Sequence, residues 1–428
     1  MKKIILTWWD DLKSFNWKMF LALCLLSLVP AIYQTVVTGL ITTQTSPGNL
    51  DIVGQMEWFD LINETLCAFL IIPMYSILSK AKKTESFNKI VFKLGVIIFV
   101  LYLLFSLGTF FYGINLISYM NPNEIDINAA YGYLSLETIA FMIGIIFSYV
   151  SVVFVVVNKE KIMYVFLSSK IILSLISDFF LIPSIGIYGI AISNIISNVV
   201  MGLIGVISLL HMGYLKVCKY NKEDVSYLKD WSRIGLFSGG QQFLDNIIYA
   251  LMIVRMVNAV GESGNYWVAN NFIWGWLLIP IMCLSEIIRK DAGEKGYKIK
   301  QSAYYIITII TILMWFILIP TYQWFFTSVE KLSNPSVIFD IVVMNLGFYV
   351  AYALSQIPDA IFVGTGKTKF NAINSLICNI GYYGLWFVLY ITNIVVMDIN
   401  MIIVMFGIGN IVHWLVSIIE EKVFLKNN

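Results

Sequence analysis

Of the 428 residues of this chain, 59% are hydrophobic and 13% are charged, whereas a soluble domain carries about 25% charged residues. Apolar stretches of roughly 20 residues recur along the whole length, which excludes a soluble domain and indicates a polytopic integral membrane protein. The net charge of +2, without a run of like charge, gives no reason to expect a nucleic-acid partner, and the five cysteines lie too far apart to indicate a disulfide framework or a metal site.

Twelve segments are long and apolar enough to cross a bilayer. They cover roughly 17–41, 56–79, 92–118, 132–157, 163–183, 186–210, 232–257, 266–288, 302–326, 338–363, 368–392 and 396–420. The sequence therefore predicts an all-α integral membrane protein with twelve transmembrane helices.

The loops between these segments predict the orientation of the chain. Lysine and arginine concentrate in the loops on the side that also holds both termini, whereas Arg255 and Lys331 fall elsewhere. The loops on the opposite side, such as SPGNLDIVGQ and NPNEIDIN, are neutral or acidic. The positive-inside rule then places both termini in the cytoplasm.

A short repeat divides the predicted spans into two halves. LIIPM at 70–74 in the second span corresponds to LLIPI at 277–281 in the eighth, and Gln34 corresponds to Gln241 at the same offset. This offset corresponds to six spans and preserves their orientation. We therefore predict two pseudo-symmetric six-helix bundles, residues 1–211 and 232–428, joined by a cytoplasmic linker at 212–231.

Several acidic side chains fall inside the predicted spans, where a carboxylate costs roughly 2.5 to 3.5 kcal/mol at the centre of a bilayer. In the second span, EWFDLINETL at 57–66 places Glu57 and Asp60 in the headgroup region, and Glu64 about 10 Å deeper. Glu137 lies near the outer end of the fourth span, and Asp178 in the fifth has Ser174 one turn earlier on its face. These side chains, Glu64, Glu137, Ser174 and Asp178, are a candidate cation or substrate site in the first half, although an ordinary solvated helix entrance would equally explain Glu137.

The second half contains two further intramembrane acids. Asp245 lies near the middle of the seventh span beside Gln241, Gln242 and Asn246, which gives that helix a polar face. In the tenth span Asp359 follows Pro358, which removes a backbone donor and loosens the preceding turn. A carboxylate beside a loosened turn is suited to hold Na+ or a proton. The alternative for Asp245 is a structural role in helix packing, and for Asp359 it is a helix cap or a contact to the cytoplasmic loop.

Four segments resemble the multidrug and toxic compound extrusion (MATE) transporters, which belong to the multidrug/oligosaccharidyl-lipid/polysaccharide exporter superfamily. They are SLISDFFLIPSIGIYGIAISN at 174–194, GLFSGGQQFLDN at 235–246, GNYWVANNFIWGWLLIPIMCLSEIIRK at 264–290 and SQIPDAIFVGTGKTKF at 355–370. The resemblance implies that Asp245 and Asp359 act together in cation coupling. The candidate polar lining of the cavity comprises the amide side chains Gln34, Gln241, Gln242, Asn246 and Gln356. The chain departs from the family at Gln44 and Thr45, where members commonly have an acid.

The leading hypothesis for function is a secondary antiporter. Na+ or H+ would enter while an organic, cationic or amphipathic compound leaves by alternating access of the two lobes. The nucleotide-binding loop of a pump is missing, because GTGKTK lacks the required spacing. We expect a monomer in a bacterial cell membrane that contacts a small-molecule substrate and lipids, with no cofactor and no metal other than the coupling Na+.

Two other functions compete with the antiporter. A flippase for a lipid-linked saccharide or similar lipid-like substrate would need cationic side chains in its cavity, for which Lys170 is the available residue. A membrane-embedded enzyme would need a catalytic pair near one interface, and a chain with two histidines and no large loop offers none. We therefore predict no catalytic residue.

Overall fold

The computed structural model describes residues 11–46, 48–82, 84–123, 125–216, 226–296 and 301–426. Within these ranges the chain forms α-helices with short π-helical segments and no β-strand, so the predicted all-α class is confirmed. Residues 217–225 of the predicted linker lie outside the described residues.

The number of membrane-spanning helices agrees with the sequence. Among the described residues, 11 helices are by length and composition able to cross a membrane, or up to 12 if one bent pair counts as a single span. The bent pair is Ser263–Leu277 with Ile279–Glu294, which meet at 51°. The chain is therefore a multi-pass membrane protein.

The helices group into two compact units, and the boundary between them differs from the predicted one. The N-unit comprises Leu40–Gly261, and the C-unit comprises the chain up to Gly39 together with the chain from Glu262 onward. Most of the first span thus groups with the second half of the chain, and the seventh span groups with the first half. The predicted lobes, 1–211 and 232–428, remain a prediction about the bodies that move during transport.

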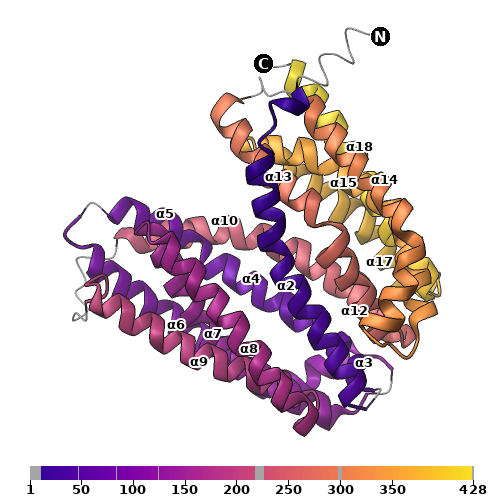
Figure 1. The fold of residues 1–428 in the computed structure, drawn as a ribbon, viewed down its shortest axis with the longest axis horizontal. Helices are drawn as coiled ribbons and strands as arrows, with labels where there is room; N and C mark the ends of the chain where they lie inside the picture. The colour runs from indigo at the N-terminus through magenta and orange to yellow at the C-terminus, as the bar shows by residue number, and fades with distance from the viewer. Residues whose placement is uncertain are drawn as a thin grey trace. The chain divides into compact units, whose positions relative to one another are not determined.

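The N-unit is built from the second to the seventh spans. Its helices are α3 (Gly48–Gln55), α4 (Glu57–Leu70), α5 (Ile72–Ala81), α6 (Phe87–Met120), α7 (Ile127–Val156), α8 (Glu160–Ile185), α9 (Tyr188–His211), α10 (Ser226–Tyr249), a π-helical segment (Ala250–Val254) and α11 (Arg255–Val260). Helix α7 packs against α6 and α9, and α8 packs against α9, so that these four long helices lie side by side (Figure 1).

Close packing against α4 explains why α10 belongs to the N-unit. A Cβ atom at Gly239 would overlap the ring of Phe69, and one at Gly235 would overlap the Phe69 carbonyl oxygen. The Ser238 hydroxyl donates to the carbonyl of Ala68 at 2.8 Å, and the Trp231 indole donates to the carbonyl of Leu70 at 3.1 Å. The glycines therefore let the two helices approach closely enough for side-chain-to-backbone bonds.

The C-unit is organised around the long helix α15. Its helices are α2 (Trp17–Gln44, whose last residues pass into the N-unit), α12 (Ser263–Phe272), a π-helical segment (Ile273–Leu277), α13 (Ile279–Lys295), α14 (Gln301–Trp324), a π-helical segment (Phe325–Val329), α15 (Pro335–Gly364), α16 (Lys369–Leu376), a π-helical segment (Ile377–Tyr383), α17 (Gly384–Ile391) and α18 (Ile399–Lys426). Helix α15 contacts α12, α13, α14 and α18.

Each unit has its own apolar core, and the outer helix faces are apolar as well. Leu78 and Val91 are fully buried in the N-unit, as is Ile361 in the C-unit. By contrast, Phe111 and Phe180 expose 80% and 66% of their surface. Large apolar side chains exposed on long helices are expected where the surrounding solvent is lipid.

The predicted repeat is visible in two broken spans. In the second span α4 ends at Leu70, and Pro73 is the second residue of α5. In the eighth span the π-helical segment ends at Leu277, and Pro280 is the second residue of α13. The two prolines thus occupy equivalent places, each in the first turn of the helix after a break, where a missing N–H is tolerated.

Candidate functional site

The acidic side chains of the spans form a separate cluster in each unit. In the N-unit, Asp60 of α4 and Glu137 of α7 line a small hollow with Tyr133. Its volume of about 10 Å³ is close to the space that one water molecule occupies. Glu137 is buried, whereas the side chain of Asp60 is exposed. The sequence places Asp60 in the headgroup region and does not indicate that it shares a hollow with Glu137.

Hydrogen bonds from α9 position Glu137 and the helix beside it. The Asn194 amide donates to Glu137 Oε1 at 3.1 Å, and the Asn198 amide donates to the carbonyl of Ala140 at 2.8 Å. Asp178 of α8 is fully buried and lies near enough to Glu137 for the two carboxylates to interact electrostatically. The structure therefore brings Asp60, Glu137 and Asp178 into one acidic cluster.

The backbone carbonyl of Ser174 takes part in a hydrogen bond that joins α8 to α9. Its carbonyl accepts a hydrogen bond from the Ser193 hydroxyl at 3.1 Å, and its side chain is buried. Closer to the end of α8, a Cβ atom at Gly189 would lie 2.6 Å from the Leu181 carbonyl carbon. The close approach of these helices holds Asp178 within the interior of the unit.

Glu64 belongs to a second polar group of the N-unit, between α4 and α10. The Asn246 amide donates to the carbonyl of Leu61 at 2.9 Å, to Thr65 Oγ1 at 3.2 Å and to Glu64 Oε2 at 3.4 Å. Gln242 in turn donates to Asn246 Oδ1 at 3.0 Å. Asn246 thus joins α10 to α4, Gln242 supports it from within α10, and Gln241 is exposed.

A charged cluster of the C-unit is centred on Asp359 of α15. His413 Nε2 lies 2.8 Å from Asp359 Oδ2, and the Ser417 hydroxyl donates to Asp359 Oδ1 at 2.8 Å. Both partners come from α18, one helical turn apart. Pro358 adds to the polarity of this turn, because it leaves the carbonyl of Leu354 without its helical donor.

A second layer of hydrogen bonds fixes these partners. The amide of Asn374 in α16 donates to Ser417 Oγ at 2.8 Å and to the carbonyl of His413 at 3.1 Å. The Cys378 thiol donates to Asn374 Oδ1 at 3.3 Å. Glu420, the next acid on α18, is buried, and among the described residues neither of its carboxylate oxygens has a hydrogen-bond partner.

The structure does not place the predicted coupling pair in one compact unit. Asp359 lies in the C-unit and Asp245 in the N-unit, next to Asn246. Sequence reasoning did not include His413 among the candidate site residues. Its spacing of four residues from Ser417 puts both on one face of the last span, but a sequence alone does not show that this face meets Asp359.

The remaining predicted polar residues lie in the C-unit. Gln356 accepts a hydrogen bond from Ser285 at 3.4 Å, one turn before Asp359. Gln34 of α2 lines a cavity of about 340 Å³ together with residues of α12 and α13. Gln34 and Gln356 therefore contribute to the polar interior of this unit.

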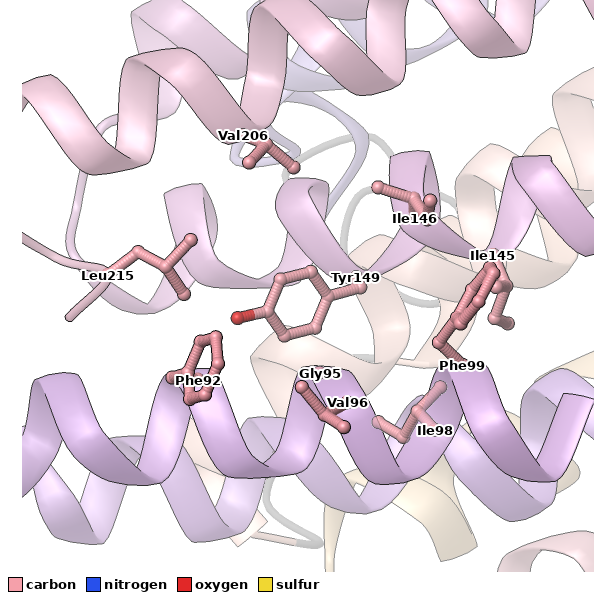
Figure 2. Close-up of a pocket in the computed structure, with 10 residues that line it drawn as sticks. All are labelled: Phe92, Gly95, Val96, Ile98, Phe99, Ile145, Ile146, Tyr149, Val206 and Leu215. Carbon is pink, nitrogen blue, oxygen red and sulfur yellow. The ribbon is translucent and has the colours of Figure 1, made fainter. Parts of the chain in front are cut away.

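Another crevice, in the N-unit, is an apolar hollow of about 230 Å³ that touches α6, α7 and α9. Figure 2 shows the ring of Tyr149 between Phe92 and Val206, with Gly95 below it. The Tyr149 hydroxyl is already used, because it donates to the carbonyl of Val91 at 2.8 Å. Since its walls are apolar, this crevice offers little to orient a substrate.

Comparisons with known proteins connect this geometry to one fold. No family model and no curated protein matches the chain. Among solved structures it is similar to an inward-facing multidrug resistance MATE family transporter of the MOP superfamily, with 16% identity, 96% of this chain and 98% of that chain covered, and a TM-score of 0.74. It is also similar to an outward-facing structure of a multidrug resistance MATE family transporter of the MOP superfamily. The identity is 16%, 98% of each chain is covered, and the TM-score is 0.68.

A third similar structure is a MOP superfamily transporter from Pyrococcus furiosus, described as having a binding pocket of reverse polarity that suggests a different function. It is 16% identical over 96% of each chain, with a TM-score of 0.67. At this identity the likeness concerns the fold. The chain thus has the MATE transporter fold that the sequence resemblance implies.

Proposed function

We propose that this chain is a secondary antiporter that exports organic, cationic or amphipathic compounds by alternating access, in exchange for Na+ or H+. The observation that carries the proposal is the presence of buried or half-buried, hydrogen-bonded carboxylates inside the membrane helices. Known transporters adopt this fold in inward-facing and outward-facing forms. Acids placed inside transmembrane bundles commonly belong to ion or substrate pathways.

Asp359 is the strongest candidate for the coupling residue. Its carboxylate faces His413 and Ser417, so a proton or Na+ that binds there would change the charge of a cluster linking α15 to α18. In the N-unit, the acids Glu64, Glu137, Asp178 and Asp245, with Ser174, are candidates for a second ion or substrate site. Binding that neutralises buried charge can bias a transporter between its two open states.

A transport assay with the purified protein in liposomes tests the proposal. Proflavine, a flat organic cation, is the probe, and its movement is followed by fluorescence under a Na+ gradient alone and under a pH gradient alone. Antiport predicts accumulation of proflavine driven by at least one gradient and dissipation of that gradient by proflavine. Transport that is equal with and without both gradients would contradict ion coupling.

A flippase for lipid-linked saccharides is the second candidate, and Lys170 is the observation that favours it. This half-buried cation lies on α8 with its Nζ 4.3 Å from the centroid of the Phe147 ring. An anionic diphosphate headgroup would be attracted to it. Replacing Lys170 with Met should abolish movement of a fluorescent undecaprenyl-diphosphate saccharide if the chain is a flippase, and should leave proflavine export intact if it is the antiporter.

A further inference from the structure

The C-unit cavity described above has the size of a small-molecule site. Its volume of about 340 Å³ lies at the lower end of the roughly 300 to 1,000 Å³ usual for ligand pockets. Its walls come from α2, α12, the π-helical segment 273–277 and α13, all within the C-unit. It is distinct from the cluster around Asp359.

Irregular backbone on both sides explains why helices leave a hollow here. Pro30 interrupts the hydrogen-bond ladder of α2 at the cavity wall, and the facing wall is π-helical and bends by 51° before α13. Beside the hollow, a Cβ added at Gly275 would lie 3.7 Å from that of Ala31, an ordinary van der Waals contact. π-Helical turns inside α-helices are frequent at functional sites.

One wall of the cavity holds an amide donor that no described residue accepts from. Asn271 Nδ2 is buried and has no hydrogen-bond partner among the described residues. A buried donor that stays unpaired costs about 1–3 kcal/mol. A ligand with an acceptor atom placed against Asn271 would remove this cost.

The aromatic part of the wall is rigidly supported. The Trp274 indole donates to the Tyr349 hydroxyl at 3.1 Å, and its ring meets that of Tyr352 edge to face at 5.4 Å. The Tyr352 hydroxyl in turn contacts the Met282 sulfur at 3.8 Å. Trp274 and Met282 thus present a fixed aromatic and thioether surface, which suits a flat apolar ring.

None of the described residues lining this cavity is charged, which distinguishes it from the acidic clusters. Its polar groups are those of Ser27, Gln34, Asn271 and the Trp274 indole. A cation bound here would lose hydration without gaining a counter-ion, whereas a neutral ligand would not incur that cost.

We infer that this cavity is a binding site for flat, uncharged, amphipathic molecules that carry a hydrogen-bond acceptor, held by Asn271 and stacked on Trp274. The inference rests on the proposed export function for its biological meaning, and it adds neutral compounds to a substrate range expected to be cationic. Binding can be measured without transport, so the two ideas can fail separately.

The test compares two fluorescent probes with the same three-ring frame in full-length protein in lipid nanodiscs. Acridone is neutral and has a carbonyl acceptor, whereas proflavine is a cation at pH 7. In the wild-type protein we expect saturable acridone binding at least tenfold tighter than proflavine binding. The same titrations are made with Asn271→Leu, a substitution that keeps the approximate side-chain size and removes the donor. Asn271→Leu should weaken acridone binding tenfold or more.

A matched pair of tryptophan variants controls for loss of folding. Trp274→Phe should weaken acridone binding, whereas Trp276→Phe should not, because Trp276 lies in the same π-helical segment but donates to Thr35 and does not line the cavity. Equal binding of both probes, or acridone binding unchanged in Asn271→Leu and Trp274→Phe, would overturn the inference. Acridone bound as predicted without gradient-driven transport would instead count against the antiporter and leave the site intact.

Discussion

At the scale of single residues, the two oxygens of Asp359 have different partners. One faces the imidazole of His413, which can gain or lose a proton, and the other accepts from the hydroxyl of Ser417, which cannot. The other titratable groups beside His413 are the Cys378 thiol and the Glu420 carboxyl. A coupling cation at Asp359 would therefore compete with a protonated His413 for the same carboxylate.

This competition predicts how transport depends on pH. As pH rises and His413 loses its proton, Asp359 becomes available to the cation, so Na+-driven proflavine transport should increase. His413→Asn can still donate a hydrogen bond but carries no charge, and its pH profile should be nearly flat. Ser417→Ala is the control: it should lower the transport rate and keep the wild-type pH profile. A wild-type pH profile in His413→Asn would contradict the role assigned to the histidine.

Glu330 predicts a second pH effect, on stability. This acid follows the π-helical segment 325–329, is 5% exposed, and its burial raises the pKa to about 8. In the unfolded chain a glutamate titrates near pH 4.3, so between these values the folded state holds the proton that the unfolded state has lost. Stability therefore decreases as pH rises through this window, by at most about 1.4 kcal/mol per pH unit.

The measurement is the thermal unfolding midpoint in detergent between pH 5 and 9. Glu330→Gln should remove most of the decrease between pH 5 and 8, and the exposed Asp340→Asn should not. If the wild type and Glu330→Gln respond to pH alike, the carboxyl of Glu330 is charged in the folded protein.

Candidate site residues could be predicted from the sequence where the residue type alone is unusual for its position. Acids inside apolar spans, such as Asp178 and Asp359, stand out because burial of charge is costly. Partners that come from other helices could not be predicted, as Asp60 beside Glu137 and His413 beside Asp359 show. Such pairs depend on how the faces of different helices meet, which periodicity within one helix does not determine.

At the scale of helices, two adjacent glycines provide a direct test of the contact between α4 and α10. Gly239→Ala would place a Cβ against the Phe69 ring and should destabilise the protein by about 1–3 kcal/mol. Gly240→Ala has nothing within 4 Å and should be neutral or slightly stabilising, since alanine favours helices.

Unfolding of the two variants in detergent, followed by circular dichroism, checks this prediction. Gly239→Ala combined with Phe69→Leu should recover part of the lost stability, because the smaller side chain leaves room. Equal stability of Gly239→Ala and Gly240→Ala would show that α10 and α4 are not packed as described.

Helix positions were predictable from apolar length, and the equivalent places of Pro73 and Pro280 from the repeat. The π-helical segments were not, although one of them forms a wall of the C-unit cavity. An extra residue in a helical turn leaves the apolar composition unchanged, so neither hydropathy nor spacing identifies it.

At the scale of the whole molecule, the loop charges predict the orientation in the membrane. A cysteine introduced at Gly48, in a variant without native cysteines, should react with a membrane-impermeant maleimide in intact cells. A cysteine at Lys83, which lies outside the described residues, should react only after permeabilisation. The opposite pattern would place both termini outside and contradict the predicted topology.

The boundary between the units was the least predictable feature at this scale. A polar linker at 212–231 marks where two repeats join in the sequence, but the contacts group helices by packing. Small residues in α10, such as Gly235 and Gly239, favour close packing with some other helix and do not specify α4. Which helix packs against α10 depends on the side chains of both helices, and the sequence of one helix does not determine it.

The central claim is that a carboxylate inside the membrane couples an ion gradient to export, and Asp359→Asn tests it most directly. The substitution preserves the side-chain shape and removes the titratable charge beside His413 and Ser417. In liposomes, gradient-driven proflavine transport should fall at least a hundredfold, while the variant inserts, folds and still binds acridone in the separate C-unit cavity. Gradient-driven transport by Asp359→Asn at the wild-type rate would contradict the account.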